Sequence, residues 1–507
     1  MKLFAILLPV GLAFFVDLLI YEGSMQSQLL QLLLRVCEDR DGEQRWQRLL
    51  QVLKKDDVQM LKYDDTVMGA ESFLQDPDGG VYTGLPGRIV KLLSDSEYED
   101  VACLDEGCGD LCSWRCARTQ HVAAVPAGEM ASHCSRPLGM RFAFSSSASA
   151  SSLSSSSQQQ RALFVCDAIR GVLRVPVESL RQKMKSLQKH EQPKQEKLKQ
   201  VQGLNRSAKT APEIQLVLKK VDDRRLFFSN ALEEVTIDGK ELLLLTDSSK
   251  AGTVGQAARI LTETTGSGRL IVFDPATGEA EVVLHDLAFP NGLALTSDRQ
   301  AVLLVEGGSR RILKYYLSGP RAGKSETVAT DLPIIPDNIT PLPDGSGFLL
   351  AGAVSRKVAT LLPTSASLGQ RLLHAAGARL FNWIVFDHLK TIAKVVNPLL
   401  QINAINAAAE WFLSKVVTGG HILVLGKDLD IKRWIALPRG CAFTSEAVVA
   451  HWGKNNTATA ASVMRQSKGE QPAAKQANSD SFVLVGSFRS APPCKLPLNA
   501  VLLAPAR

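Results

Sequence analysis

The sequence predicts an all-β fold, a six-bladed β-propeller, and two runs of residues carry this prediction. Residues 289–320 (FPNGLALTSDRQAVLLVEGGSRRILKYYLSGP) and 336–352 (PDNITPLPDGSGFLLAG) each have a polar residue near the start, a short strand, a turn and a second strand. The turns are expected at Asp298 and at 343–345. Such a repeated unit of sheet is typical of a propeller, whose inner strands begin at a common axis. We therefore expect the chemistry of this protein at the first residues of those strands.

Six repeats of the unit can be assigned along the chain. They cover residues 69–92, 134–175, 229–284, 289–320, 336–352 and a last unit that starts near Ser462 and resumes at 480–498. The equivalent first positions are Glu71, Leu138, Asn230, Asn291, Asp337 and, in the last unit, about Ser462. The 46 residues from Asn291 to Asp337 fit one four-stranded blade. Larger separations indicate inserts between strands.

The N-terminal segment differs in character from the repeats. Residues 1–23 contain the apolar run MKLFAILLPVGLAFFVDLLIY, which is typical of a signal anchor or a signal peptide. Residues 24–64 carry apolar side chains at helical spacing and are predicted to form a helical stem. The propeller itself is expected over residues 65–503. This order predicts the secretory pathway, with the propeller in the lumen of the endoplasmic reticulum or outside the plasma membrane.

Three inserts interrupt the predicted propeller. Residues 145–160 are a serine- and glutamine-rich tract and residues 183–213 are rich in lysine and glutamine, so neither can form a core. Residues 366–416 are apolar and predicted to be helical; they would contact either a membrane surface or the propeller face. Much of the formal charge of +7 lies in residues 183–220. Because no aromatic residues alternate with these lysines, we expect no nucleic-acid partner.

Cysteine usage agrees with an oxidising compartment. Five of the nine cysteines lie between residues 103 and 134, and Cys108, Cys112 and Cys116 have a spacing that a zinc site could also use. Disulfides are favoured over zinc in a secretory protein. Asn205 and Asn455 lie in glycosylation sequons.

The first positions of the inner strands bring two carboxylates, Glu71 and Asp337, to one axis together with Asn230, Asn291 and Asn338. Two close carboxylates repel each other in a dry site, and a cation removes that repulsion. Carboxylate and amide oxygens suit calcium, whereas zinc would favour histidine or cysteine. The alternative is that these side chains only cap the strands through hydrogen bonds.

Two further acidic residues end inner strands of the predicted blades. Asp167, in VCDAIRG, and Asp247, in LTDSSK, are expected to bond backbone amides and to be structural.

Several motifs resemble the strictosidine synthase-like family of six-bladed propellers. They include CSRPLGMRF, GRLIVFDPATGE, FPNGLALTSD, LPIIPDNI and GSFRSAPPCKLPLNAV, and the resemblance covers about residues 65 to 500 outside the inserts. The wider superfamily contains calcium-dependent hydrolases. The resemblance implies a central calcium on Glu71, Asn230, Asn291, Asp337 and Asn338. It also implies a disulfide from Cys134 to Cys112 or Cys116.

Two positions depart from the family pattern. True strictosidine synthases use a glutamate just before the last blade's strand as general base for a Pictet-Spengler condensation, and counting back from GSFRS puts Ser462 there. The histidine base of the paraoxonase type falls near Leu138, which cannot accept a proton.

Three functions are therefore weighed. The first is a calcium-dependent ester or lactone hydrolase of the arylesterase type, in which Asp337 orients water or attacks the substrate directly. The alternative is a non-catalytic, membrane-anchored binding propeller with a structural calcium. The third, strictosidine synthase itself, is disfavoured because of Ser462. The membrane partner would be reached through the N-terminal anchor and residues 366–416.

Overall fold

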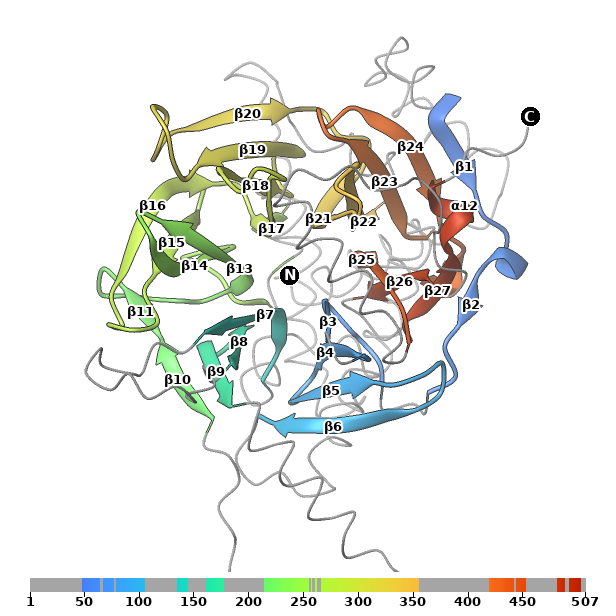
Figure 1. The fold of residues 1–507 in the computed structure, drawn as a ribbon, viewed down its shortest axis with the longest axis horizontal. Helices are drawn as coiled ribbons and strands as arrows, with labels where there is room; N and C mark the ends of the chain where they lie inside the picture. Colours follow the sequence, from blue (N-terminus) through green and yellow to red (C-terminus); the bar gives the residue numbers. More distant parts are fainter. Residues whose placement is uncertain are drawn as a thin grey trace, which may run out of the picture. The chain divides into compact units, whose positions relative to one another are not determined.

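The computed structural model describes residues 48–63, 67–76, 79–104, 135–144, 161–176, 214–354 (without 255–256, 258–259 and 262–265), 419–452 (without 442–443), 481–487 and 492–502. Contacts divide the chain into two units, Met1–Leu50 and Gln51–Arg507. The second unit holds six antiparallel sheets around a central axis and is a six-bladed β-propeller, as predicted (Figure 1).

Each sheet runs from an inner strand at the axis to an outer strand at the rim. The first is β3 (Phe73–Gln75), β4 (Val81–Leu85), β5 (Arg88–Leu92) and β6 (Tyr98–Cys103). The second is β7 (Pro137–Phe144), β8 (Arg161–Asp167), β9 (Gly171–Pro176) and β10 (Gln215–Leu218). The third is β13 (Ser229–Ile237), β14 (Lys240–Asp247), β15 (Gly268–Phe273) and β16 (Ala280–Leu287).

The remaining three sheets follow the same order. The fourth is β17 (Pro290–Leu295), β18 (Ala301–Glu306), β19 (Arg311–Tyr316) and β20 (Ser325–Ala329). The fifth is β21 (Ile335–Pro341), β22 (Gly347–Val354), β23 (His421–Gly426) and β24 (Ile431–Ala436), with β1 (Leu50–Val52) at its edge. The sixth is β25 (Thr444–Ala450), β26 (Phe482–Ser487), β27 (Cys494–Pro497) and β2 (Gln59–Met60). A small hairpin of β11 (Lys220–Val221) and β12 (Arg224–Arg225) precedes the third sheet.

Second strands of the blades can be buried on both faces because each sheet packs between two neighbours. All six residues of β18 (AVLLVE) and of β26 (FVLVGS) are buried, which matches their nearly continuous apolar sequences. One core cluster, for example, joins Val235 and Leu244 of the third sheet to Leu293 and Val302 of the fourth. The hydrophobic core is therefore distributed between adjacent blades.

The hairpin turns form where the sequence predicts them. Asp298 Oδ1 accepts a hydrogen bond of 3.0 Å from the backbone of Gln300, and Asp344 Oδ1 accepts one of 2.9 Å from Ser346. Gly345 has a φ of +67°, which only glycine adopts without cost.

The ring closes through a strand that precedes the first blade. β2 pairs antiparallel with β27, with Gln59 opposite Lys495, so the N-terminal side completes the last sheet. Asp95, in the first blade, joins this closure: its carboxylate accepts hydrogen bonds from Lys495 Nζ (2.8 Å), Trp452 Nε1 (2.7 Å) and Gln59 Nε2 (2.9 Å). The closure therefore uses a carboxylate with three donors as well as a strand pair.

Two expectations about organisation need correction. The last inner strand does not start near Ser462; it is β25, which starts at Thr444. The described end of the predicted helical stem contains β1, the short 3-10 helix η1 (Lys55–Asp57) and β2, whose pairing makes this segment part of the propeller. Sheet pairing outweighs the helical spacing of apolar residues there.

Other expectations fall outside the described residues. These are the anchor at 1–23, the inserts at 145–160, 183–213 and 366–416, Ser462, and the disulfide of Cys134 with Cys112 or Cys116. Within the part of the chain that the structure describes, no helix is long and apolar enough to cross a membrane.

Replacing Asp95 by alanine should destabilise the ring closure. Three donors lose a shared acceptor, and Lys495 loses its charge partner, so we expect the free energy of unfolding to fall by about 2 kcal/mol. Chemical denaturation of the full chain measures this. Asp430→Ala, which removes an exposed carboxylate paired with Lys432, is the control and should change stability by less than about 0.5 kcal/mol. Equal effects of the two substitutions would show that Asp95 does not hold the closure.

Candidate functional site at the propeller axis

The inner strands share one irregularity that defines the site. The pairing of five inner strands with their second strands shifts near the start of the inner strand, where two residues are left without a register partner. A β-bulge inserts unpaired residues and re-aims their side chains, often beside active sites. The two residues inside each shift are Leu138–Gly139, Asn230–Ala231, Asn291–Gly292, Asp337–Asn338 and Ser445–Glu446. In the first blade the equivalent pair is Glu71–Ser72, directly before β3.

This register tests the positions expected from the sequence. Five of the six first positions hold: Glu71, Leu138, Asn230, Asn291 and Asp337. The sixth is Ser445 and not Ser462, and its neighbour Glu446 was missed. Residues 453–480 separate β25 from β26, so a count back from GSFRS ends inside an insert. The run TSEAVVA, with polar residues before alternating apolar ones, was the signal available at residues 444–450.

In two of the pairs the second residue is a glycine, and there the neighbouring inner strands approach closely. A Cβ on Gly139 would lie 2.7 Å from Asn230 O, and one on Gly292 would lie 2.6 Å from Asn338 Cα. Both distances are too short for a real side chain. The glycines therefore let the backbones of adjacent blades converge, and this brings the polar first residues to the axis.

The candidate ligands are buried, and several of their oxygens lack partners. The side chains of Glu71, Asn230, Asn291, Asp337 and Asn338 are all less than 10% exposed. Glu71 Oε2, Asn291 Oδ1 and Asp337 Oδ1 accept no hydrogen bond from the described residues. The Nδ2 group of Asn230 donates to Ser248 Oγ at 2.9 Å, which leaves its oxygen as an acceptor. Unpartnered buried acceptors cost about 1–3 kcal/mol each, so the axis favours a ligand that supplies positive charge.

The pKa shifts of the axial carboxyl groups also favour a ligand that supplies positive charge. Burial raises the pKa of Glu71, the Arg136 guanidinium lowers it, and the charge of Glu446 raises it further. Burial raises the pKa of Asp337 well above its ordinary value, and the charges of Glu71 and Glu446 add to this, against a hydrogen bond from Asn291. The carboxyl groups at the axis therefore disfavour one another's charged forms.

Glu446 is fixed between three blades. One carboxylate oxygen accepts a hydrogen bond from the backbone N–H of Phe73 in the first blade, and the other accepts one of 3.2 Å from Thr340 Oγ1 in the fifth. Burial raises the pKa of Glu446 to about 7, although the charge of Arg141 and these hydrogen bonds lower it. A carboxyl group with such a pKa can take or give a proton at neutral pH.

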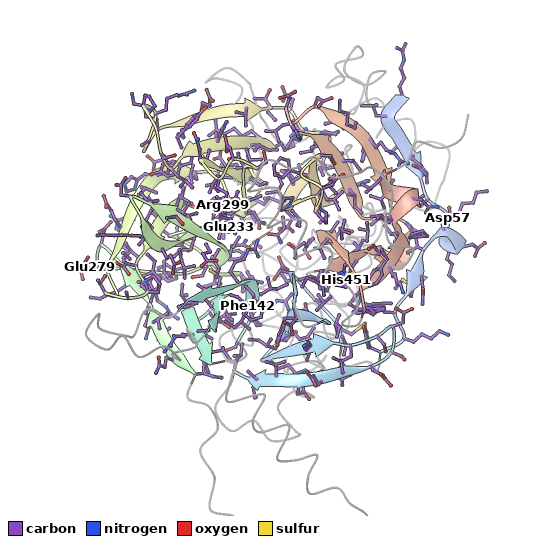
Figure 2. All side chains as sticks on the ribbon, in the orientation of Figure 1. Asp57, Phe142, Glu233, Glu279, Arg299 and His451 are labelled. Atoms are coloured by element: carbon purple, nitrogen blue, oxygen red, sulfur yellow. A yellow bond between two sulfur atoms is a disulfide. The ribbon has the colours of Figure 1, made fainter. Side chains whose placement is uncertain are left out.

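Arg141 and Glu233 form an ion pair between the inner strands of the second and third blades. Arg141 Nε and Nη2 donate to Glu233 Oε2 at 3.2 and 3.1 Å. Figure 2 shows Glu233 toward the middle of the ring and Glu279 at its rim. The field of Arg141 reaches Glu446 and partly offsets its burial.

The second blade contributes an apolar residue, Leu138, and a buried cation, Arg136. Leu138 packs in an apolar cluster with Phe228, Phe289 and Ile260, so this blade adds no ligand at the ring position. Arg136 places Nη2 3.7 Å from Glu71 Oε2 and donates through Nη1 to Gly69 O at 3.0 Å. The first blade's carboxylate therefore has a buried counter-charge.

The donor set fits a hard divalent cation. Within the described ranges, no three histidine, cysteine, aspartate or glutamate residues are grouped closely enough to hold a metal. A cation here would therefore depend on the amide oxygens of Asn230, Asn291 and Asn338 together with the two carboxylates. The unpartnered oxygens of Glu71, Asn291 and Asp337 are of the type calcium prefers.

Asp167 and Asp247 bond backbone amides, as predicted, but they end the second strands β8 and β14 and not inner strands. Asp167 Oδ1 accepts hydrogen bonds from the backbone of Ile169 (2.9 Å) and Arg170 (2.8 Å). Asp247 accepts one of 3.0 Å from Phe228 N and is paired with Arg269.

Comparison with known proteins gives sequence relatives of one kind. The family described as strictosidine synthase matches residues 233–320. Strictosidine synthase-like 13 of Arabidopsis thaliana is 29% identical over 282 residues, which cover 55% of this chain and 57% of that protein. The adipocyte plasma membrane-associated protein of Mus musculus is 28% identical over 295 residues, which cover 58% and 55%. The chain thus spans little more than half the length of these relatives.

Among solved structures, a gluconolactonase of Xanthomonas campestris aligns with a TM-score of 0.40 and 11% identity over 87% of this chain and 89% of that chain. Regucalcin of Agrobacterium tumefaciens, a calcium-binding protein, aligns with a TM-score of 0.40 and 11% identity over 88% and 94%. Likeness at this level carries no argument about function.

The raised pKa of Glu446 predicts how stability depends on pH. The folded chain keeps a proton on this carboxyl up to a pH of about 7, whereas the unfolded chain releases it near pH 4.3. Between these values the folded state binds more protons, so stability should fall as pH rises from about 4.5 to 7. Without divalent cations, we expect Glu446→Gln to remove about 3 kcal/mol of this fall.

Chemical denaturation of the full chain in a chelator, at several pH values, measures the effect. Glu279→Gln, at the exposed rim, is the control and should keep the pH dependence of the unchanged protein. If Glu446→Gln also keeps the pH dependence of stability of the unchanged protein, the carboxyl of Glu446 is ionised in the folded state at pH 5.

Proposed function

The chain belongs to the strictosidine synthase-like family, and we propose that it is a calcium-dependent hydrolase of small esters or lactones that acts at the propeller axis. The single observation that supports this most is that buried oxygens of Glu71, Asn291 and Asp337 accept no hydrogen bond from the described residues. Bound calcium would polarise the substrate carbonyl and stabilise the negative charge that develops on its oxygen.

The roles of the protein groups follow from their positions. Glu71, Asn230, Asn291, Asp337 and Asn338 would hold the cation, because they occupy equivalent bulges or lie beside them. Asp337 would also orient the attacking water. Its neighbour Asn291 fixes its carboxyl by a side-chain hydrogen bond.

Glu446 would act as the general base. Its pKa of about 7 matches proton transfer at neutral pH, and its hydrogen bonds to Phe73 and Thr340 hold its orientation. Glu446 would take the proton of the attacking water and return it to the leaving alkoxide. Direct attack by Asp337 is the alternative route.

Glu446 also favours a second candidate, the condensation of an arylalkylamine with an aldehyde. The sequence argument against this reaction was Ser462 at the base position, but the last inner strand β25 carries a buried glutamate, Glu446, beside Ser445. A buried carboxylate can bind an ammonium group and later accept its proton. Assays with tryptamine and secologanin, beside ester and lactone assays, separate the two candidates.

We propose that the propeller lies outside the cytoplasm. The disulfide Cys441–Cys494 is typical of oxidising compartments. Relatives are named as plasma membrane-associated proteins. Membrane attachment through residues 1–23, and membrane contact by residues 366–416, belong to the same proposal.

Removal of one axial ligand should abolish calcium binding and hydrolysis together. For Asp337→Ala and Asn291→Ala we expect calcium affinity, measured by calorimetry, and aryl-ester or lactone turnover to fall at least about 100-fold, because each substitution removes a ligand from a sparse set. The matched control is Asp344→Ala, at the other end of the same hairpin, which should keep both. Calcium binding without turnover in the unchanged protein would favour the non-catalytic binding propeller. If the unchanged protein binds no calcium, these residues only cap the strands through hydrogen bonds.

A further inference from the structure

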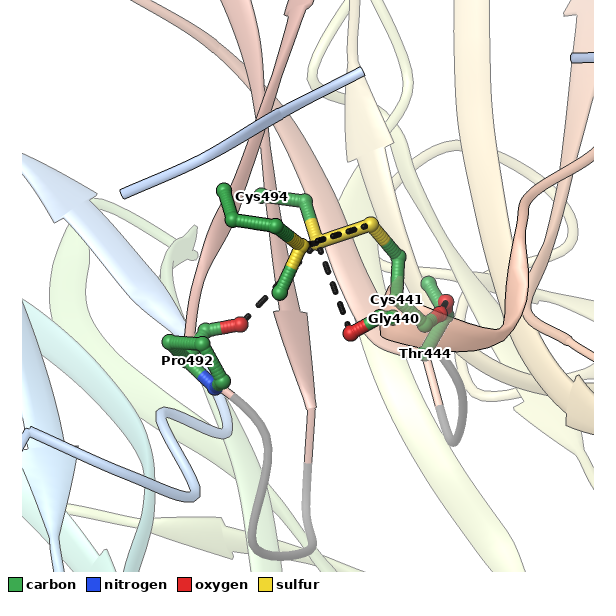
Figure 3. The surroundings of a disulfide bond; sticks show 6 residues. Gly440, Cys441, Thr444, Pro492 and Cys494 are labelled. Carbon is green, nitrogen blue, oxygen red and sulfur yellow. Dashed lines mark hydrogen bonds between the residues drawn. A yellow bond between two sulfur atoms is a disulfide. The ribbon is translucent and has the colours of Figure 1, made fainter. Parts of the chain in front are cut away.

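A buried disulfide lies directly before the last inner strand. It joins Cys441, at the end of the 3-10 helix η4 (Arg439–Cys441), to Cys494, the first residue of β27, and the two cysteines are 53 residues apart in sequence (Figure 3). Cys441 is 2% and Cys494 1% exposed. Met60 of the closing strand β2 covers the bond, with its sulfur 3.3 Å from Cys494 Sγ and 3.7 Å from Cys441 Sγ.

The bond connects to the axis through three consecutive residues. Thr444 Oγ1 donates to Cys441 O at 2.9 Å, which ties the start of β25 to the disulfide. Ser445 Oγ donates to Glu71 O at 2.7 Å, and the Glu446 carboxylate accepts from Phe73 N. A fixed Cys441 therefore places Ser445 and Glu446, the two bulge residues of the sixth blade, against the first blade.

In two other blades, the third and the fourth, a carboxylate holds the entry to the inner strand. In the third blade Asp247, at the end of the second strand, accepts from Phe228 N at 3.0 Å, just before β13. In the fourth blade Glu306 accepts from Ala288 N at 2.7 Å, two residues before β17. The sixth blade has Ser487 at this register position, opposite Thr444, and a serine carries no charge. The disulfide occupies the same part of the blade and ties down the same entry segment.

We propose that the Cys441–Cys494 disulfide is a positioning element of the axial site. It takes the place of the carboxylate that holds the entry to the inner strand in the third and fourth blades, and it fixes Ser445 and Glu446. Its consequence for catalysis rests on the proposed function, but its consequence for local structure does not. Loss of the bond should free the entry to β25, so that Glu446 leaves Phe73 N and the sixth blade loosens from the first at the axis.

Hydrogen exchange measured by mass spectrometry on the full chain tests this directly. In the double variant Cys441→Ser/Cys494→Ser we expect amides in 71–76 and 444–450 to exchange at least about 10-fold faster, while 229–237 in the third blade is unchanged. Asp95→Ala is the matched control, because it weakens the same closure without touching the Cys441 segment. It should lower the melting temperature but leave exchange in 444–450 unchanged.

A second readout concerns function. Calcium affinity and the pH midpoint of turnover should change in the disulfide variant and not in Asp95→Ala, because only the former moves Glu446. If hydrolysis or calcium binding is absent from the unchanged protein, the proposed function fails while the exchange result still decides the positioning role. Should the double variant not fold, Thr444→Val, which removes only the bond to Cys441 O, should give a smaller change in the same two segments. Unchanged exchange in both segments, or equal changes in Asp95→Ala, would overturn the proposal.

Discussion

The burial of three carboxyl groups beside one axis is the constraint on which the rest of the structure depends. Glu71, Asp337 and Glu446 come from three different blades and are each less than 10% exposed. Burial raises all three pKa values; the charge of Glu446 raises that of Glu71, the charges of Glu71 and Glu446 raise that of Asp337, and Glu233 raises that of Glu446. Arg136 beside Glu71 and Arg141 beside Glu446 act in the opposite direction. Such an arrangement is costly unless the groups are protonated or bind a cation. The fold therefore keeps a site whose polar groups are not satisfied by the described protein residues alone, which is characteristic of functional sites.

Bulges in five of the six inner strands make this convergence possible, and the closed ring holds it. The glycines at 139 and 292 allow neighbouring backbones to approach within distances that a Cβ would prevent. Each inner strand contacts the next around the ring. The last blade meets the first through Asp95 at one place and through Ser445 and Glu446 at the axis, and β2 completes the last sheet.

The blades present different side chains toward the axis, and the proposed chemistry depends on this difference. Five blades present polar groups toward the axis, and the second presents Leu138, which packs with Phe228, Phe289 and Ile260. Amide and carboxylate oxygens provide a set suited to calcium, and Glu446 provides a group that can exchange a proton near neutral pH. Cation binding, water orientation and proton transfer can therefore be divided among different blades. This division is the physical basis of the hydrolase that we propose.

The sequence by itself determined the propeller, five of the six first positions and the structural roles of Asp167 and Asp247. These depend on local patterns: strand, turn and polar residue recur at regular spacing, and a carboxylate after a strand bonds the next amides. Only the tertiary structure decided that the sixth position is Ser445, with Glu446 beside it, that β2 closes the last sheet, and that Cys441 pairs with Cys494. Each of these joins residues separated by an insert or by most of the chain. Register across such gaps is set by pairing between strands in space, and counting along the sequence cannot recover it.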